Sequence, residues 1–144
     1  MDLRRIDDRV SVAPQIAVED IDAIKSAGFT AIINNRPDDE DMGQPSGAAI
    51  RDAATAAGLR YYEIPVTHSG FSHPQLDAMA AAIEEAGGPV LAYCRSGTRS
   101  CNLWALARAK SAGDDPTALS AKAAAAGYDL SSIRAMLDAL AAGR

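Results

Sequence analysis

The chain contains two cysteines, and one of them, Cys94, opens a string of residues whose types and spacing could support chemistry. The string is CRSGTRS at residues 94–100, and it is called the Cys94 loop from here on. It follows a short apolar run and precedes a segment with helical character. Backbone N–H groups in such a turn, together with the positive end of the helix, favour a bound anion. We therefore expect Cys94 to carry an accessible, stabilised thiolate that acts as a nucleophile beside an anionic substrate.

The other members of the Cys94 loop fit the same chemistry. Arg99 closes the loop with a cation, and we predict that it forms the catalytic pair with Cys94. Arg95 adds a second cation that could bind an anionic substrate. Gly97 gives the turn its conformational freedom. The backbone N–H groups that complete the predicted anion site belong to Ser96, Gly97, Thr98 and Ser100. The alternatives are a buried structural cysteine, a solvated Arg95 and an Arg99 that only braces the loop.

Strands and helices alternate along the chain in an order that would position this loop. Apolar runs predict strands at residues 10–12, 29–34, 61–66 and 89–93. Helical spacing and capping residues predict helices at about 18–27, 46–57, 74–87, 98–112, from 116, and from 129 or 131 to 141. This alternation predicts an α/β domain with a largely parallel sheet, whose carboxyl strand ends gather the ligand-binding loops. No linker or repeat is visible, so residues 1–144 are predicted to form one catalytic domain.

The bulk composition excludes several classes of protein. With 144 residues, 48% of them hydrophobic, the chain can form one domain with a packed core. The formal net charge of −5 argues against nucleic acid as a partner. No apolar run is long enough to span a membrane, residues 1–9 do not resemble a signal peptide, and two cysteines do not make a disulfide framework. These features predict a cytoplasmic protein without a membrane partner.

Other reactive residues have simpler interpretations. Cys101 is expected to be a small core residue, with resolution of an oxidised Cys94 as the alternative. The two histidines, His68 and His73, lack the spacing of a metal site, so no metal is predicted. His68 is the better active-site candidate because it lies in the loop after a predicted strand, whereas His73 precedes a helix-starting proline. The acidic run at residues 38–41 is predicted to be a solvated face.

The Cys94 loop resembles the active-site loops of protein tyrosine or dual-specificity phosphatases and of rhodaneses. Further blocks resemble the beta-lactamase hydrolase-like phosphatase-fold family, also described as a sulfurtransferase family: VAPQ (12–15), GFT (28–30), IINNRPD (32–38) and QP (44–45). The resemblance extends from about residue 10 to about residue 112. It implies a dual-specificity-phosphatase-like, three-layer α/β fold with a central, mostly parallel sheet of about four to five strands flanked by helices. It also implies that Arg36 helps line the cleft, and that a persulfide-oxidising enzyme of the metallohydrolase fold is a partner.

Two departures from the phosphatase pattern favour sulfur chemistry. Only four residues separate Cys94 from Arg99, as in rhodanese-like loops, whereas the phosphatase signature has five and would place its arginine at Ser100. The loop at residues 65–73 contains no aspartate to act as the general acid of such phosphatases. We therefore predict a rhodanese-like sulfurtransferase that moves sulfane sulfur from thiosulfate or a low-molecular-weight persulfide through a Cys94 persulfide.

Two other functions remain open on the same residues. With His68 in place of the missing acid, the chain would be a cysteine-dependent tyrosine or dual-specificity-type phosphatase that forms a phosphocysteine at Cys94. The third possible function is that of a non-catalytic anion or redox sensor, for which redox pairing of Cys94 with Cys101 would be the mark. None of the three functions implies a metal or an organic cofactor. The corresponding partner is an anionic sulfur donor or a phosphoester substrate.

Overall fold

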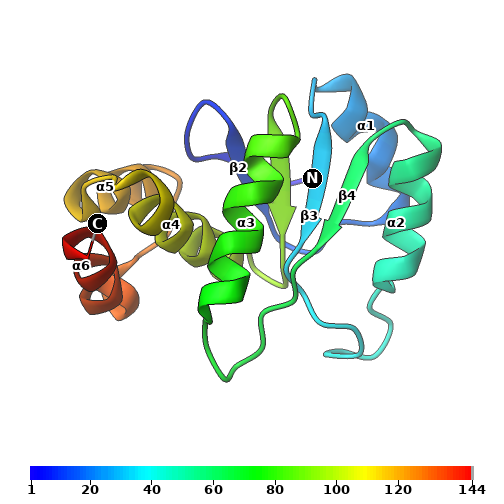
Figure 1. Cartoon of the computed structure of the whole chain (residues 1–144). Coiled ribbons are helices and arrows are strands. Elements are labelled where there is room, and N and C mark those ends of the chain that lie inside the picture. The colour runs from blue at the N-terminus through cyan, green and yellow to red at the C-terminus, as the bar shows by residue number, and fades with distance from the viewer. Residues whose placement is uncertain (144) are drawn as a thin grey trace.

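Five short strands form one sheet in the computed structural model, which describes residues 1–143 (Figure 1). In spatial order the strands are β1 (Arg4–Arg5), β2 (Val10–Ala13), β5 (Val90–Tyr93), β3 (Ala31–Asn34) and β4 (Arg60–Glu63). β1 runs antiparallel to β2, and all other neighbouring strands are parallel. This arrangement confirms the predicted mostly parallel sheet and places β5 in its middle.

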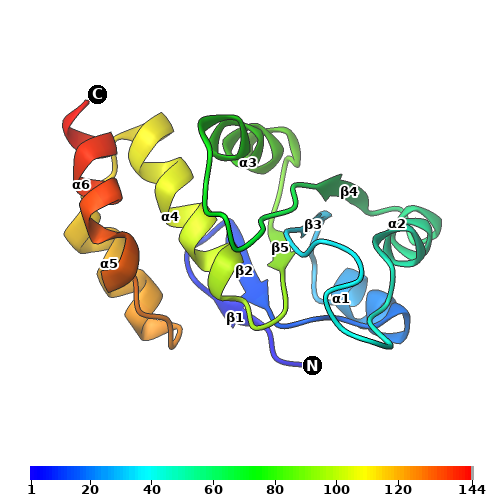
Figure 2. The ribbon, with the colours of Figure 1, turned by 90° about the horizontal axis from the view of Figure 1, so that it is seen from below.

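Helices cover both faces of the sheet, which gives the expected three layers (Figures 1 and 2). They are the 3-10 turn η1 (Val18–Asp20), α1 (Ile21–Ser26), α2 (Gly47–Ala56), α3 (His73–Glu85), α4 (Thr98–Ala112), α5 (Pro116–Ala125), the 3-10 turn η2 (Ser131–Ile133) and α6 (Arg134–Ala142). α1 and α2 pack on one face, around Ile24 and Ile50. α3 and α4 pack on the other face, and α5 and α6 lie outside α4. No helix within residues 1–143 has the length and apolar character needed to cross a membrane.

Local signals in the sequence set several helix ends. The Ser46 hydroxyl accepts a hydrogen bond from the Ala49 N–H at 3.1 Å and so caps α2. Asp115 caps α5 in the same way, directly before a proline at the first helical position. α4 begins after Gly97 and ends before Gly113, with φ angles of 93° and 69° that suit glycine. The predicted bounds of α4 are confirmed.

The strand ends differ from the sequence prediction. β4 stops at Glu63, although the run predicted as a strand extends to Val66. Pro65 has no N–H to donate, so beyond Glu63 the chain follows β3 only through isolated bonds, such as that from the Val66 N–H to the Asn35 carbonyl at 2.9 Å. β1 was not predicted, because a pair of arginines shows no apolar alternation.

α4 is a rigid support for the loop that precedes it. It contacts α3, α5 and α6, and its buried side chains include Leu103, Trp104 and Leu106. The Trp104 indole Nε1–H donates to Asp7 Oδ2 at 3.0 Å, which ties the helix to the turn between β1 and β2. The N-terminus of α4 is therefore fixed by packing on several sides.

Candidate active site

Cys94 lies at the carboxyl end of the central strand. The last residue of β5, Tyr93, is in register with Ala13 of β2 and Asn34 of β3, so three strands end at the same edge. The Cys94 N–H donates to the Ala13 carbonyl at 3.4 Å, and the Gln15 N–H donates to the Arg95 carbonyl at 3.3 Å. Figure 2 shows β5 leading into the loop that continues as α4. The nucleophile candidate is therefore held between two neighbouring strands at a helix N-terminus.

The backbone of the Cys94 loop supplies N–H groups to the sulfur and its surroundings. The Gly97 N–H donates to Cys94 Sγ at 3.1 Å. Within residues 1–143, the N–H groups of Arg95, Ser96, Arg99 and Ser100 have no protein acceptor. The Thr98 N–H bonds only to the Ser96 hydroxyl, at 3.4 Å. Together with the N-terminus of α4, this set of donors favours a thiolate and an adjacent anion.

The two cysteines are both buried, which corrects one sequence prediction. Cys94 is only 1% exposed, so the thiol that was expected to be accessible is instead buried, with the Gly97 N–H on its sulfur. Cys101 is fully buried on α4, and burial raises the pKa of its thiol to about 12, with the nearby Cys94 charge adding to the effect. A thiol with this pKa stays protonated near neutral pH. The structure therefore supports the core interpretation of Cys101.

Arg99 is fixed by an acidic partner that lies far away in sequence. Its Nη1 donates to Glu40 Oε2 and to the Val66 carbonyl, both at 2.7 Å, and its Nη2 donates to Glu40 Oε1 at 2.8 Å. These bonds raise the pKa of Arg99, chiefly through Glu40, and the charge of Cys94 contributes to the same shift. The Nε–H and one Nη2 hydrogen remain for an anion beside the sulfur. Arg99 is thus both a brace and a cation near Cys94.

Glu40 belongs to the acidic run that was predicted to be a solvated face, and this prediction is wrong for Glu40. Its side chain is 17% exposed and also accepts a bond from Arg36 Nε at 2.9 Å. The hydrogen bond from Arg99 is the main cause of a Glu40 pKa of about 2. A carboxyl group with this pKa is ionised near neutral pH and cannot act as a general acid. A run of charges carries no sign of a partner in another loop, so the sequence could not show this contact.

The family resemblance implied that Arg36 helps line the cleft, and the structure shows its side chain bonded to acidic neighbours. Its side chain is 4% exposed, and besides Glu40 it donates to Gln15 Oε1 at 3.0 Å and to Asp41 Oδ2 at 2.7 Å. These three bonds use three of the five N–H groups of Arg36, and through them Arg36 holds the segment 35–46 against the site. The side chain of Arg95 is 68% exposed, and its Nε lies 3.3 Å from Asp41 Oδ2. Arg95 was predicted to bind an anion, and its exposed side chain can turn toward a ligand.

A profile of one protein family matches residues 2–111 of the chain, and it describes the phosphatase-like domain of the beta-lactamase hydrolase-like proteins. The chain belongs to this family. The match confirms the resemblance inferred from the sequence. It covers all five strands and the Cys94 loop, and it ends within α4. Residues 112–143, which contain α5 and α6, lie beyond it.

Relatives of this beta-lactamase hydrolase-like domain support the same fold. A beta-lactamase hydrolase-like protein of Agrobacterium fabrum is 39% identical over 105 residues, which are 73% of this chain and 24% of that protein. The chain thus spans about a quarter of this curated relative. A crystal structure of a Neisseria meningitidis protein described as a candidate phosphatase is 34% identical, with a TM-score of 0.85 over 97% of this chain and 99% of that one. Tk-PTP in its active form, 23% identical with a TM-score of 0.76, covers 98% and 97% and shows the fold alone.

The loop that would supply an acid in a phosphatase-like domain departs from the phosphatase pattern here. The segment 67–72 between Val66 and α3 contains no aspartate or glutamate. It begins at the site, because the Val66 carbonyl binds Arg99, and His68 follows two residues later as an exposed side chain.

Ser100 is fully buried, and its hydroxyl has no hydrogen-bond partner in the described part of the chain. Residues 1–143 also contain no cluster of three or more residues that could bind a metal.

Proposed function

We propose that the chain is a cysteine-dependent phosphatase in which Cys94 is the nucleophile. The observation that carries the proposal is the Gly97 N–H bond to Cys94 Sγ at 3.1 Å, at the N-terminus of α4 and beside Arg99. Donors in this position stabilise the attacking thiolate and the oxygens of a phosphoryl group. The family match and the Neisseria meningitidis relative support this alternative better than the sulfur transfer that the sequence favoured.

The reaction would proceed in two steps at the sulfur. The Cys94 thiolate attacks phosphorus, an S–P bond forms, and the bond between phosphorus and the ester oxygen breaks. The leaving oxygen takes a proton from water or from His68. Water then attacks the phosphocysteine, the S–P bond breaks, and inorganic phosphate leaves with the thiolate restored. Arg99 and the loop N–H groups bind the phosphoryl oxygens in both steps.

The missing carboxyl group in the segment 67–72 restricts the substrate. Removing one general acid lowers a rate by roughly 10²–10⁴. Glu40 cannot replace it, since its pKa of about 2 keeps it ionised. The proposed substrate is therefore an ester whose leaving group departs without full protonation, such as an aryl phosphate, in preference to an alkyl phosphate.

Sulfur transfer is the second candidate, and the four-residue spacing between Cys94 and Arg99 favours it. The thiolate would attack the outer sulfur of thiosulfate, an S–S bond would form, and sulfite would leave with its electron pair. Cyanide or an acceptor thiolate would then remove the sulfur from the Cys94 persulfide. Sulfite leaves without protonation near neutral pH, so this reaction needs no placed acid. An enzyme of the metallohydrolase fold that oxidises persulfides would be the partner for such a product.

One preparation can test both reactions. We expect hydrolysis of an aryl phosphate by the unaltered chain, its loss in Cys94→Ser, and its retention in Cys101→Ala, because only Cys94 contacts the loop N–H groups. Incubation with thiosulfate, followed by intact mass, measures sulfur uptake. A gain of one sulfur that cyanide removes, without hydrolysis, would replace the phosphatase proposal by sulfur transfer. Equal loss of activity in both variants would contradict a mechanism with one cysteine.

A further inference from the structure

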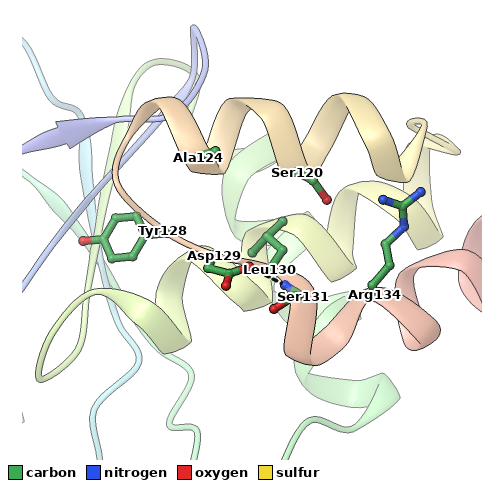
Figure 3. Close-up of a pocket in the computed structure, with 7 residues that line it drawn as sticks. All are labelled: Ser120, Ala124, Tyr128, Asp129, Leu130, Ser131 and Arg134. Carbon is green, nitrogen blue, oxygen red and sulfur yellow. Dashed lines mark hydrogen bonds between the residues drawn. The ribbon is translucent and has the colours of Figure 1, made fainter.

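A tyrosine outside residues 2–111, the range that the family profile matches, contacts the Cys94 loop. Tyr128 follows α5, is 8% exposed, and donates its hydroxyl hydrogen to the Ser96 carbonyl at 3.2 Å. Figure 3 shows it at one end of the hollow between α5 and α6, with its hydroxyl pointing away from the other six residues drawn. The C-terminal helices thus reach the loop through this side chain.

The acceptor of this bond belongs to the same peptide group that contacts the sulfur. In a planar trans peptide, the carbonyl of one residue and the N–H of the next point in opposite directions. The Ser96–Gly97 peptide is trans, with its carbonyl on the Tyr128 hydroxyl and its N–H on Cys94 Sγ at 3.1 Å. Rotation of this plane would break both bonds together. The hydroxyl therefore fixes the direction of the donor that faces the nucleophile.

Packing around Gly97 limits the same rotation. The φ angle of Gly97 is 93°, and a Cβ atom at this position would overlap the Tyr128 hydroxyl. The ring of Tyr128 is itself held by Arg4, whose guanidinium carbon lies 5.3 Å from the ring centroid and whose Nη1 donates to the Ala126 carbonyl at 3.2 Å. Burial raises the pKa of Tyr128, so the hydroxyl keeps its proton near neutral pH and can donate it in a hydrogen bond.

We propose that Tyr128 is a positioning residue for Cys94, acting through the Ser96–Gly97 peptide, and that Arg4 holds its ring in place. This inference rests on the proposed role of Cys94 as the nucleophile. It adds a residue from the C-terminal part of the chain to those that position the nucleophile. Tyr128 touches no reacting atom in this arrangement. It acts on the strength of the N–H bond to the thiolate.

The test is alkylation of Cys94 by iodoacetamide across a range of pH, followed by intact mass and peptide mapping, in the full chain. In Tyr128→Phe we expect the rate near neutral pH to fall about threefold to tenfold, the effect of one weakened hydrogen bond. The midpoint of the pH profile should move upward, with the rate recovered at high pH. Arg4→Gln should shift the profile in the same direction by a smaller amount. Tyr62→Phe is the matched control, since that hydroxyl bonds to Glu85 at 3.1 Å on another part of the surface.

The outcomes separate this inference from the proposed function. If the profiles of Tyr128→Phe and the unaltered chain coincide, the inference is overturned, even where the melting temperature falls, because a purely structural role would leave the profile unchanged. If Cys94 in the unaltered chain reacts no faster than Cys101, both the inference and the nucleophile proposal are overturned. A raised midpoint in Tyr128→Phe with no phosphate or sulfur turnover would support the inference and contradict only the proposed reaction.

Discussion

At the scale of single residues, the bond between Glu40 and Arg99 has consequences for stability. The two side chains meet across 59 positions of sequence through two hydrogen bonds, and Arg36 makes a third contact to the same carboxylate. Neither Glu40 nor Arg99 is more than 17% exposed. Charged hydrogen bonds in such surroundings contribute more than exposed ion pairs. The contact therefore joins the segment 35–46 to the Cys94 loop.

The Glu40 pKa of about 2, against an ordinary 4.5, predicts how stability varies with pH. Below about pH 4.5 the unfolded chain takes up a proton at this carboxyl, whereas the folded chain does not until near pH 2. The stabilisation is thus complete above that window and is lost as pH falls through it. Glu40→Gln should lower the free energy of unfolding by about 1.5–3 kcal/mol near neutral pH, and by less at low pH. Urea unfolding at several pH values measures this difference.

The control for this prediction is Glu85→Gln, which also replaces a carboxylate by an amide. Glu85 forms an ion pair with Arg60 at the surface, where the Arg60 side chain is 56% exposed and that of Glu85 61%. We expect at most about 1 kcal/mol from it. If the difference in unfolding free energy between Glu40→Gln and the unaltered chain is the same at neutral and at low pH, the assignment of the pKa shift to Glu40 is contradicted.

At the scale of elements, the Cys94 loop and α4 form one unit with Gly97 at the junction. Its positive φ angle begins the helix, its N–H contacts the sulfur, and its carbonyl accepts from the Cys101 N–H at 2.9 Å. No side chain can occupy this position without strain or contact with Tyr128. The unit therefore depends on a glycine for backbone conformation and for space.

Gly97→Ala tests this dependence, and Gly28→Ala provides a matched control. Gly28 has a similar φ of 98°, but nothing lies within 4 Å of its missing Cβ. Both variants should lose about 1–3 kcal/mol of unfolding free energy from backbone strain, with Gly97→Ala losing more. Only Gly97→Ala should also lower the alkylation rate of Cys94. Similar rates in the two variants would show that the Gly97 peptide does not control the thiolate.

The elements that could be predicted from the sequence are those whose ends carry local signals. The bounds of α4, the Ser46 cap and the Asp115 cap all depend on residues within a few positions of each other. The Cys94 loop was identified for the same reason. The contacts of Glu40 with Arg99 and of Tyr128 with Ser96 join residues 59 and 32 positions apart, and no local pattern encodes them. Those contacts decide which residues brace the site, so the sequence could show neither the role of Glu40 as a brace nor the bonds that Arg36 makes to Glu40 and Asp41.

At the scale of the whole molecule, the C-terminal helices share the core of the family domain. Leu119 of α5 and Leu137 of α6 are buried in the same cluster as the strand residues Val90 and Ala92. Trp104, on α4, lies in that cluster too, and it is the single tryptophan of the chain. A core of this kind predicts that α5 and α6 unfold together with the sheet.

Trp104 offers a direct measurement of this cooperativity. Its indole is fully buried and bonded to Asp7, so its fluorescence should be blue-shifted in the folded state and should shift to the red on unfolding. We expect the urea transition followed by Trp104 fluorescence to coincide with that followed by far-ultraviolet circular dichroism, since elements that share one buried cluster should unfold in one step. A separate, earlier loss of helical signal would contradict a single domain that includes residues 112–143.

The two edge strands of the sheet determine whether copies of this chain can aggregate by pairing strand to strand. Exposed edge strands invite pairing with another chain, and charged side chains on an edge oppose it. One edge here is β1, which is only Arg4 and Arg5, and the other is β4, which begins with Arg60 and ends with Glu63. A second copy that added to β1 would find only two residues to pair with, and both carry long charged side chains that are ion-paired within their own chain. The short, charged strand β1 thus opposes aggregation by sheet extension, and the same strand contributes Arg4, which holds the ring of Tyr128.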